Sequence, residues 1–468
     1  MHIKKTARKI EFHNQKHGAP IKIISCEVIG NGERYIYTVK LKAGTKESLL
    51  FDRAKDIRTA LRLQLYQPFK EGLAIRIAVS ERPITENSLK KMLESPAFLK
   101  SKMKIPIALG YDMRGEMRFV DLVKIIHAMY AGSTGSGKSV GLWCLILSII
   151  YLQTVSQVNL LLFDVGANTL EPFIGIPHLS HPIVKDITTA IYVIKELVVE
   201  MEKRMKLAHI ELLKKPALVC IIDEYVSLIS NIGDKKLSQL LTGTISNLLR
   251  RGRQVKIHMV LATQDPTLKN MKVDLGNITA RMAFACAKYH NSITILGEGG
   301  AEKLPGRGAM LFKSNENPEP VYLQGAYMDT EEIKRLVAYI KSKSYDFTNK
   351  FVIPEIDLAQ QQILPAEAFD PKTSVEDSQK ELVDIIFWVL GRDNVSKLQI
   401  MKQFHMGNRA DAVIDWLFKM NLIADKYATQ PRTVIPQTIE DIPTEITELL
   451  INNGVSEDDI AGVIQNRN

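Results

Sequence analysis

Apolar runs typical of strands alternate with amphipathic stretches typical of helices between residues 105 and 345. The runs are short, and most of them end at a polar or glycine-rich turn, as the strands of a buried sheet do. We expect strands at 106–109, 116–120, 125–131, 159–164, 217–223, 258–263 and 280–286, and helices at 140–152, 190–205, 237–251 and 330–343. This alternation predicts an α/β fold with a mostly parallel sheet that helices cover on both faces.

Two smaller regions flank this core, and each has its own pattern. Residues 20–80 predict a small α+β unit with strands at 21–29, 35–41 and 73–79 and a helix at 52–65. After a stretch rich in proline, glutamine and acidic residues, three short amphipathic helices are expected at 381–390, 396–404 and 409–420. A β-wing at 422–435 would complete the element order of a winged helix.

The last segment predicts a helical hairpin at 445–452 and 456–465, with Ser456 and Asp459 spaced for a capping box. The sequence therefore divides into five parts. They are a small N-terminal α+β domain at 1–104, an α/β core at 105–345, a linker at 346–378, a C-terminal winged-helix domain at 379–435 and an acidic hairpin tail at 436–468.

A phosphate-binding loop directly follows the strand predicted at 125–131. In such a P-loop, backbone N–H groups and the positive end of the next helix surround the phosphates of a nucleoside triphosphate. Lys138 would neutralise the β and γ phosphates, and the Ser139 hydroxyl suits Mg²⁺. The residues expected to bind ATP are Gly132, Ser133, Thr134, Gly135, Ser136, Gly137, Lys138, Ser139 and Val140. Glycine-rich strings also arise by chance in surface loops, but the flanking strand and helix favour the P-loop.

The strand at 217–223 delivers two acids, Asp223 and Glu224, to its carboxyl end. Asp223 would hold the Mg²⁺ shell through water, and Glu224 would act as the base on the attacking water. Strands that end in two acids are common, but the preceding P-loop makes the catalytic interpretation the stronger one. The strand at 258–263 leads into Gln264, whose amide could orient the water or report on loss of the γ phosphate.

The chain of 468 residues has a formal net charge of +9, with basic residues crowded near its start and acidic ones near its end. A positive balance favours a polyanionic partner such as nucleic acid, although solvated surface charge explains it too. No apolar stretch is long enough to span a bilayer, and the start lacks the apolar core of a signal peptide. We therefore expect a cytoplasmic protein without direct membrane insertion.

Taken in order, the motifs make residues 20–435 resemble the FtsK/SpoIIIE family of DNA translocases, hexameric motors that pump double-stranded DNA. The resemblance rests on the segments 131–141, 175–179, 200–204, 223–225, 257–264 and 300–308. It implies a RecA-like P-loop ATPase core, a collar formed by the N-terminal domain, and a winged helix that binds or orients on DNA.

The resemblance also assigns roles to single residues. The arginine that the family lends to a neighbouring subunit falls on Arg253, and Arg281 resembles a second family arginine. Arg250 and Arg251 fit a solvated or DNA-facing surface as well as they fit such a role. The side chains expected to contact DNA are Asn408 and Arg409 of the recognition helix and Lys269 and Lys272 after the Gln264 strand.

Three departures from the family pattern affect the expected grip on DNA. Asp164-Val165-Gly166 stands where the family usually has Asp-Pro-Lys, and Asp265 replaces an arginine. A segment that includes a pore loop is largely missing between Arg204 and the strand at 217–223. The membrane-spanning N-terminus of the chromosome-segregating members also has no counterpart in the sequence.

We therefore expect an ATPase that uses ATP and Mg²⁺ to move double-stranded DNA through a homo-hexameric ring. The main alternative is a coupling or recruitment ATPase of a conjugation or secretion system, which binds DNA or protein without long-range pumping. A static nucleotide-gated DNA-binding module, in which Glu224 is not catalytic, is a third. The acidic hairpin tail matches no part of the family, and we expect it to dock a partner protein.

Overall fold

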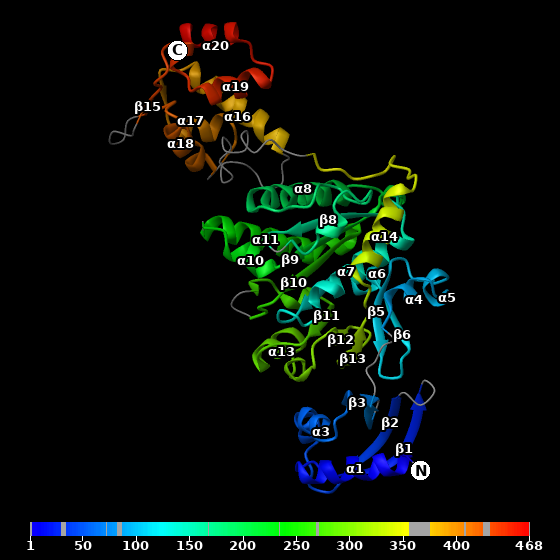
Figure 1. Cartoon of the computed structure of the whole chain (residues 1–468). Coiled ribbons are helices and arrows are strands. Elements are labelled where there is room, and N and C mark those ends of the chain that lie inside the picture. The colour runs from blue at the N-terminus through cyan, green and yellow to red at the C-terminus, as the bar shows by residue number, and fades with distance from the viewer. Residues whose placement is uncertain are drawn as a thin grey trace. The chain divides into compact units, whose positions relative to one another are not determined.

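The computed structural model describes residues 2–29, 34–71, 73–81, 87–166, 168–233, 235–267, 271–354, 375–406, 409–424 and 431–467 (Figure 1). Two compact units make up the chain. The first comprises residues 1–187 and 207–352, and the second comprises residues 188–206 and 353–468.

The first unit begins with a four-stranded antiparallel sheet in the order β1-β2-β4-β3. Its elements are α1 (His2–Lys16), β1 (Ile21–Ile29), β2 (Arg34–Leu41), α2 (Glu47–Asp52), α3 (Ala54–Ala60), β3 (Leu65–Glu71) and β4 (Ala74–Ser80). Ile10 of α1 and Ile57 of α3 are buried in one core with Tyr37, Tyr66 and Ile77 of the sheet. The three predicted strands are confirmed, but the sequence missed helix α1 and strand β3.

A nine-stranded sheet in the order β6-β5-β13-β12-β11-β7-β10-β9-β8 forms the centre of the first unit. The strands are β5 (Pro106–Asp112), β6 (Met117–Asp121), β7 (Ala128–Ala131), β8 (Val158–Asp164), β9 (Ala217–Asp223), β10 (Ile257–Thr263), β11 (Ala280–Phe284), β12 (Ala309–Ser314) and β13 (Val321–Gly325). From β11 to β8 all neighbours are parallel, whereas from β6 to β11 all neighbours are antiparallel.

The prediction of a mostly parallel sheet is therefore wrong for one side of this sheet. Short connections join β5 to β6 and β12 to β13, and two strands joined by a tight turn can only pair antiparallel. On the parallel side, every residue of β8, β9 and β10 is buried. Burial on both faces explains why these strands are continuous apolar runs in the sequence.

Helices cover both faces of the parallel side. On one face, α7 (Lys138–Leu152) shares a core with α4 (Leu89–Leu93) and α14 (Thr330–Ser342), where Leu145, Met92 and Val337 are buried. On the other face, α10 (Tyr225–Ser230) and α11 (Lys235–Arg251) contact β10. Other helices in the described part of this unit include α5 (Pro96–Leu99), α6 (Leu122–Ile125), α9 (His209–Lys214) and α13 (Tyr289–Leu296), with short 3-10 turns such as η2 (Gly252–Val255).

The second unit is mainly helical. Its elements are α8 (Ile187–Met205), α16 (Val375–Leu390), β14 (Asn394–Val395), α17 (Lys397–Gln403), α18 (Ala410–Lys419), β15 (Arg432–Thr433), α19 (Thr444–Asn452) and α20 (Glu457–Gln465). β14 pairs antiparallel with β15, and Ile423 bridges Val434. Within the described ranges, no helix combines the length and apolarity needed to cross a membrane.

The predicted hairpin tail is part of this unit's core. Leu450 of α19 and Ile460 of α20 are buried in the same cluster as Ile386 of α16 and Leu417 of α18. Glu448, Asp458 and Asp459 are exposed on helices whose buried residues are apolar. The tail therefore stabilises the helices before it.

Replacing Leu450 by alanine should destabilise this unit by about 2–5 kcal/mol, because the change leaves a cavity in a closed core. The neighbouring Ile451 is 42% exposed on the same helix, and its replacement by alanine should cost less than about 1 kcal/mol. Urea unfolding followed by tryptophan fluorescence measures both variants, since Trp388 and Trp416 lie in this unit. Equal effects of the two changes would contradict a shared core.

Candidate functional site

The phosphate loop leaves the sheet between two parallel neighbours. β7 ends at Ala131, and it lies between β10 and β11, with Ala131 in register with Thr263 and Ala283. The backbone N–H of Gly132 donates to the Thr263 carbonyl (3.3 Å), and that of Ser133 donates to the Ala285 carbonyl (2.9 Å). Both neighbouring strands therefore hold the start of the loop at the carboxyl edge of the sheet, where α/β proteins bind ligands.

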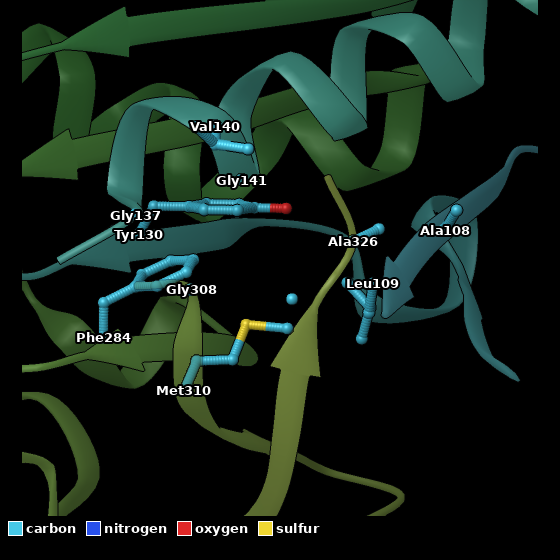
Figure 2. Close-up of a pocket in the computed structure, with 11 residues that line it drawn as sticks. Ala108, Leu109, Tyr130, Gly137, Val140, Gly141, Phe284, Gly308, Met310 and Ala326 are labelled. Atoms are coloured by element: carbon cyan, nitrogen blue, oxygen red, sulfur yellow. The ribbon is translucent and has the colours of Figure 1, made fainter. Parts of the chain in front are cut away.

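Two aromatic rings support the loop from below. Figure 2 shows Tyr130 of β7 and Phe284 of β11 lying one above the other beneath the turn that carries Gly137 and Gly141, and their ring centroids are 6.3 Å apart. A Cβ on Gly141 would lie 2.6 Å from the Phe284 ring, and one on Gly137 would lie 2.6 Å from the Gly308 Cα. Gly137 also has φ 110, a region open mainly to glycine. At both positions a side chain would collide with neighbouring atoms, so glycine is required.

The antiparallel side of the sheet also holds the loop. The Gly308 N–H, just before β12, donates to the Ser136 carbonyl (2.8 Å), and the Gly325 N–H of β13 donates to the Gly308 carbonyl (2.7 Å). Ser136 is buried, and its hydroxyl has no hydrogen-bond partner among the described residues. Loop, β12 and β13 therefore form one connected backbone structure.

Lys138 lies between the two acids predicted for the site. It is the first residue of α7, and its Nζ is 2.5 Å from Asp223 Oδ1 and 2.5 Å from Glu224 Oε1. Lys138 and Asp223 are buried, with exposed fractions of 5% and 1%, and Glu224 is partly buried, with 12% exposed. Because β9 lies two strands from β7, residues 85 positions apart in the sequence meet at one edge of the sheet.

This cluster fits a nucleoside triphosphate with Mg²⁺. One ammonium between two carboxylates leaves a net negative charge, so the acids can exchange the lysine for a divalent cation when phosphates bind Lys138. Asp223 Oδ2 is buried and has no hydrogen-bond partner within the described ranges, which leaves it available to a bound water or metal ion. Ser139, the residue after Lys138, lines a pocket beside the phosphate loop together with Lys138.

Gln264 connects the end of β10 to both sides of this cluster. Its side-chain oxygen accepts a hydrogen bond from Thr134 Oγ1 (2.6 Å), and its backbone N–H donates to Glu224 Oε2 (3.3 Å). Glu224 itself adopts φ 54, a left-handed conformation that is uncommon for a non-glycine residue. The structure thus brings together Lys138, Asp223, Glu224 and Gln264.

The pocket beside the loop includes residues that sequence reasoning missed. Along with most of the predicted loop residues, it is lined by Asn87, Arg307 and Tyr327, whereas Gly132 and Ser136 do not line it. The Gly306-Arg307-Gly308 segment was a visible signal, since two glycines flank a cation. Asn87 and Tyr327 had none, because they reach the pocket only through sheet and loop packing.

Arg253 lies at the far end of the sheet from its own phosphate loop. It is exposed in η2, four residues before β10 begins, and the seven residues of β10 span about 20 Å. An arginine side chain cannot cover that distance. Arg253 therefore cannot complete the site of its own chain.

The Arg281 side chain is hydrogen-bonded to backbone carbonyls of its own chain. Its guanidinium donates to the carbonyls of Leu275 (2.7 Å) and Ile295 (2.9 Å), and burial lowers its pKa. These contacts tie the segment before β11 to the end of α13. Arg281 is thus a structural residue within this chain.

The predicted DNA contacts are spread over both units. Lys272 is exposed, whereas Lys269 and Asn408 lie outside the described residues. Arg409 precedes α18, and its Nη1 lies 3.5 Å from Glu381 Oε2 of α16. This ion pair competes with any phosphate that approaches Arg409.

Comparison with known proteins gives the site its context. Residues 88–209 match the model of the FtsK/SpoIIIE family. The chain is 30% identical to DNA translocase SftA of Bacillus subtilis (strain 168), over 85% of this chain and 42% of that protein. It is 30% identical to DNA translocase FtsK of Bacillus cereus, over 94% of this chain and 56% of that protein.

The chain spans about half the length of the curated relatives that it matches. Among solved structures, the conjugation coupling protein TcpA of pCW3, in its monomer form with ATPγS, is 17% identical, with a TM-score of 0.48 over 72% of this chain and 99% of that one. The matched segment 88–209 contains β5 to α7, including the whole phosphate loop. Residues 88–209 form a domain of the FtsK/SpoIIIE family.

Proposed function

We propose that this chain is the ATP-hydrolysing motor of a double-stranded DNA translocase. The buried contact of Lys138 with Asp223 and Glu224 carries the proposal, because it joins the phosphate loop to the two acids that hydrolysis requires. The relatives named DNA translocase support DNA as the substrate. The exposed Arg253 supports a RecA-like ring in which neighbouring subunits share a site.

The proposed chemistry uses groups that already touch one another. Lys138 exchanges its carboxylate partners for the β and γ phosphates of ATP. Asp223 and Ser139 are the residues that would hold Mg²⁺, which supplies positive charge against the phosphate oxygens. Glu224, released from Lys138, accepts a proton from the attacking water, and Gln264 orients that water through its contacts with Thr134 and Glu224.

The position of Arg253 supports the proposed ring. An arginine that cannot reach its own loop but stands exposed at the opposite edge can enter the site of a neighbouring copy, where it stabilises charge that develops during phosphoryl transfer. We propose a homo-hexamer, with the N-terminal α+β domain as its collar and a cytoplasmic location.

The second unit is proposed to bind DNA as a winged helix. The order α16, β14, α17, α18, β15 is the order of elements in that fold, with α18 as the recognition helix. On DNA, Arg409 would exchange Glu381 for a phosphate or a base edge, beside Asn408. Lys269 and Lys272 are the proposed contacts of the motor core.

A coupling or recruitment ATPase is the second candidate, and the second unit favours it. Arg409 is already ion-paired, and the acidic α19 and α20 share a core with the DNA-binding elements. Such a unit suits a protein partner at its acidic face more than a tight grip on DNA. Both candidates use the same ATPase site.

Replacing Lys138 by alanine should abolish DNA-stimulated ATP hydrolysis and ATP binding, because two buried carboxylates would then face the triphosphate. Glu224→Gln should keep ATP binding but lower kcat at least about 100-fold, since it removes the base and keeps the shape. A phosphate-release assay with and without long duplex DNA measures turnover. Lys334→Ala, on the exposed face of α14, is the control and should match the wild type. Intact turnover in Glu224→Gln would favour a static module instead.

Arg253→Ala subunits mixed with Lys138→Ala subunits should regain part of the ATPase activity that each lacks alone. In a mixed ring, some sites combine an intact phosphate loop with an intact arginine from the neighbour. Arg335→Ala, on the exposed face of α14, serves as the matched control and should be active on its own. Mixtures no more active than the sum of the separate variants would exclude the shared site.

Displacement of a third strand from a DNA triplex separates the two candidate functions. A translocase strips the third strand at a rate that depends on ATP and on Glu224, whereas a recruiting ATPase binds the duplex and leaves the triplex intact. We expect displacement by the wild type and none by Glu224→Gln. ATP turnover on duplex DNA without displacement would establish the recruitment function.

A further inference from the structure

The pocket beside the phosphate loop is also lined by Asn87, Arg307 and Tyr327. These residues come from three separate connections of the first unit. None of them belongs to the phosphate-loop motif, and the proposed hydrolysis uses none of them. They need a separate explanation.

Arg307 is held in a conformation that its own side chain disfavours. Its φ is 53, between Gly306 (φ 79) and Gly308 (φ 85), so the chain passes through three left-handed residues. Gln324 Nε2 donates to the Arg307 carbonyl (2.9 Å), and the next N–H, that of Gly308, donates to Ser136 (2.8 Å). Because the backbone is fixed on both sides, the position of this strained residue relative to the phosphate loop is fixed too.

The Arg307 side chain is available to a ligand. It is exposed, and within the described ranges its guanidinium makes no hydrogen bond or ion pair with the protein. Its neighbour in the chain, Gly308, contacts the loop directly. A strained backbone that carries an unengaged cation into a phosphate pocket is suited to an anionic oxygen.

Tyr327 is fixed in a similar way. Its N–H donates to the Asn87 carbonyl (2.7 Å), and its own carbonyl accepts from the Leu89 N–H (2.8 Å), which forms a bridge between the segment before α4 and the segment after β13. Nevertheless 51% of Tyr327 is exposed. An aromatic ring on a rigid backbone at the edge of a polar pocket offers a flat apolar surface to a ligand.

The direction of the bound nucleotide follows from the loop. Lys138, Glu224 and Gln264 mark the end where the γ phosphate must lie, and the first turn of α7 faces the phosphates nearer the nucleoside. Val140 of this turn lines the pocket beside the loop together with Ala326 and Tyr327. The nucleoside therefore leaves the loop on the side of Tyr327.

We propose that Tyr327 packs against the purine ring of the nucleotide and that Arg307 binds its α phosphate. Tyr327 makes the site selective for a nucleoside triphosphate over a bare polyphosphate, and Arg307 positions the phosphate chain. The inference rests on the proposed function only in that the pocket must bind ATP.

Isothermal titration of the full chain with ATP, with AMP and with inorganic tripolyphosphate tests both residues. Tyr327→Ala should weaken ATP binding about tenfold and leave tripolyphosphate binding within about twofold, whereas Tyr327→Phe should bind ATP like the wild type. Tyr339→Ala removes another exposed tyrosine, on α14, and should change neither affinity. If Tyr327→Ala weakens the binding of ATP and of tripolyphosphate equally, or weakens neither, Tyr327 does not pack against the purine ring.

Arg307→Ala should weaken the binding of ATP and the binding of AMP alike, by about tenfold or more, because both ligands carry an α phosphate. Arg307→Lys should recover part of the loss. If the variant binds ATP more weakly but binds AMP like the wild type, Arg307 does not bind the α phosphate. A wild type that binds neither ATP nor tripolyphosphate would overturn the proposed function together with this inference. Normal ATP binding by the variants, with DNA-stimulated turnover intact, would overturn this inference alone.

Discussion

The buried Lys138 ammonium between Asp223 and Glu224 is the contact on which the site depends. A charge of this kind is stable away from water only when opposite charges surround it, so the three side chains constrain one another. The sheet order supplies the constraint. Since β10 lies between β7 and β9, Lys138 and the acids meet across it, and Gln264 at its end contacts Glu224. Parallel register thus turns three distant motifs into one polar cluster.

The antiparallel side of the sheet is as important to the site as the parallel side. The phosphate loop packs on Phe284. The Gly308 N–H donates a hydrogen bond to the Ser136 carbonyl of the loop, and the Gly308 carbonyl accepts one from Gly325 of β13. Because the same connection carries Arg307 and the next one carries Tyr327, one packing arrangement supports the loop and builds the outer wall of the pocket. A shift of β12 or β13 would therefore also shift the phosphate loop. The phosphate loop and the strands β12 and β13 are thus connected by short backbone hydrogen bonds.

The sequence predicted most elements of the core because their signals are local. The apolar run at 217–223 corresponds residue for residue to β9, and the helix expected at 330–343 corresponds to α14. The misses have physical causes. Residues 2–16 are basic enough to suggest a solvated segment, yet Ile10 buries one side of α1 against the sheet. The acidic tail was predicted as a separate part because it matches no part of the family, whereas Leu450 and Ile460 place it in the core of the second unit.

The sequence by itself determined the phosphate loop and the order of the acids and the amide, because a P-loop is a local backbone structure with a fixed spacing of glycines, lysine and serine. Tertiary structure alone decided which remote groups share the pocket with it. Tyr327, Arg307 and Asn87 are brought there by strand pairing and by backbone bonds between segments far apart in the chain. It also decided that Arg253 lies beyond the reach of its own loop, since that depends on the length and direction of β10. The local spacing of residues therefore specifies the phosphate loop, whereas the packing of the sheet determines which other residues line the pocket beside it.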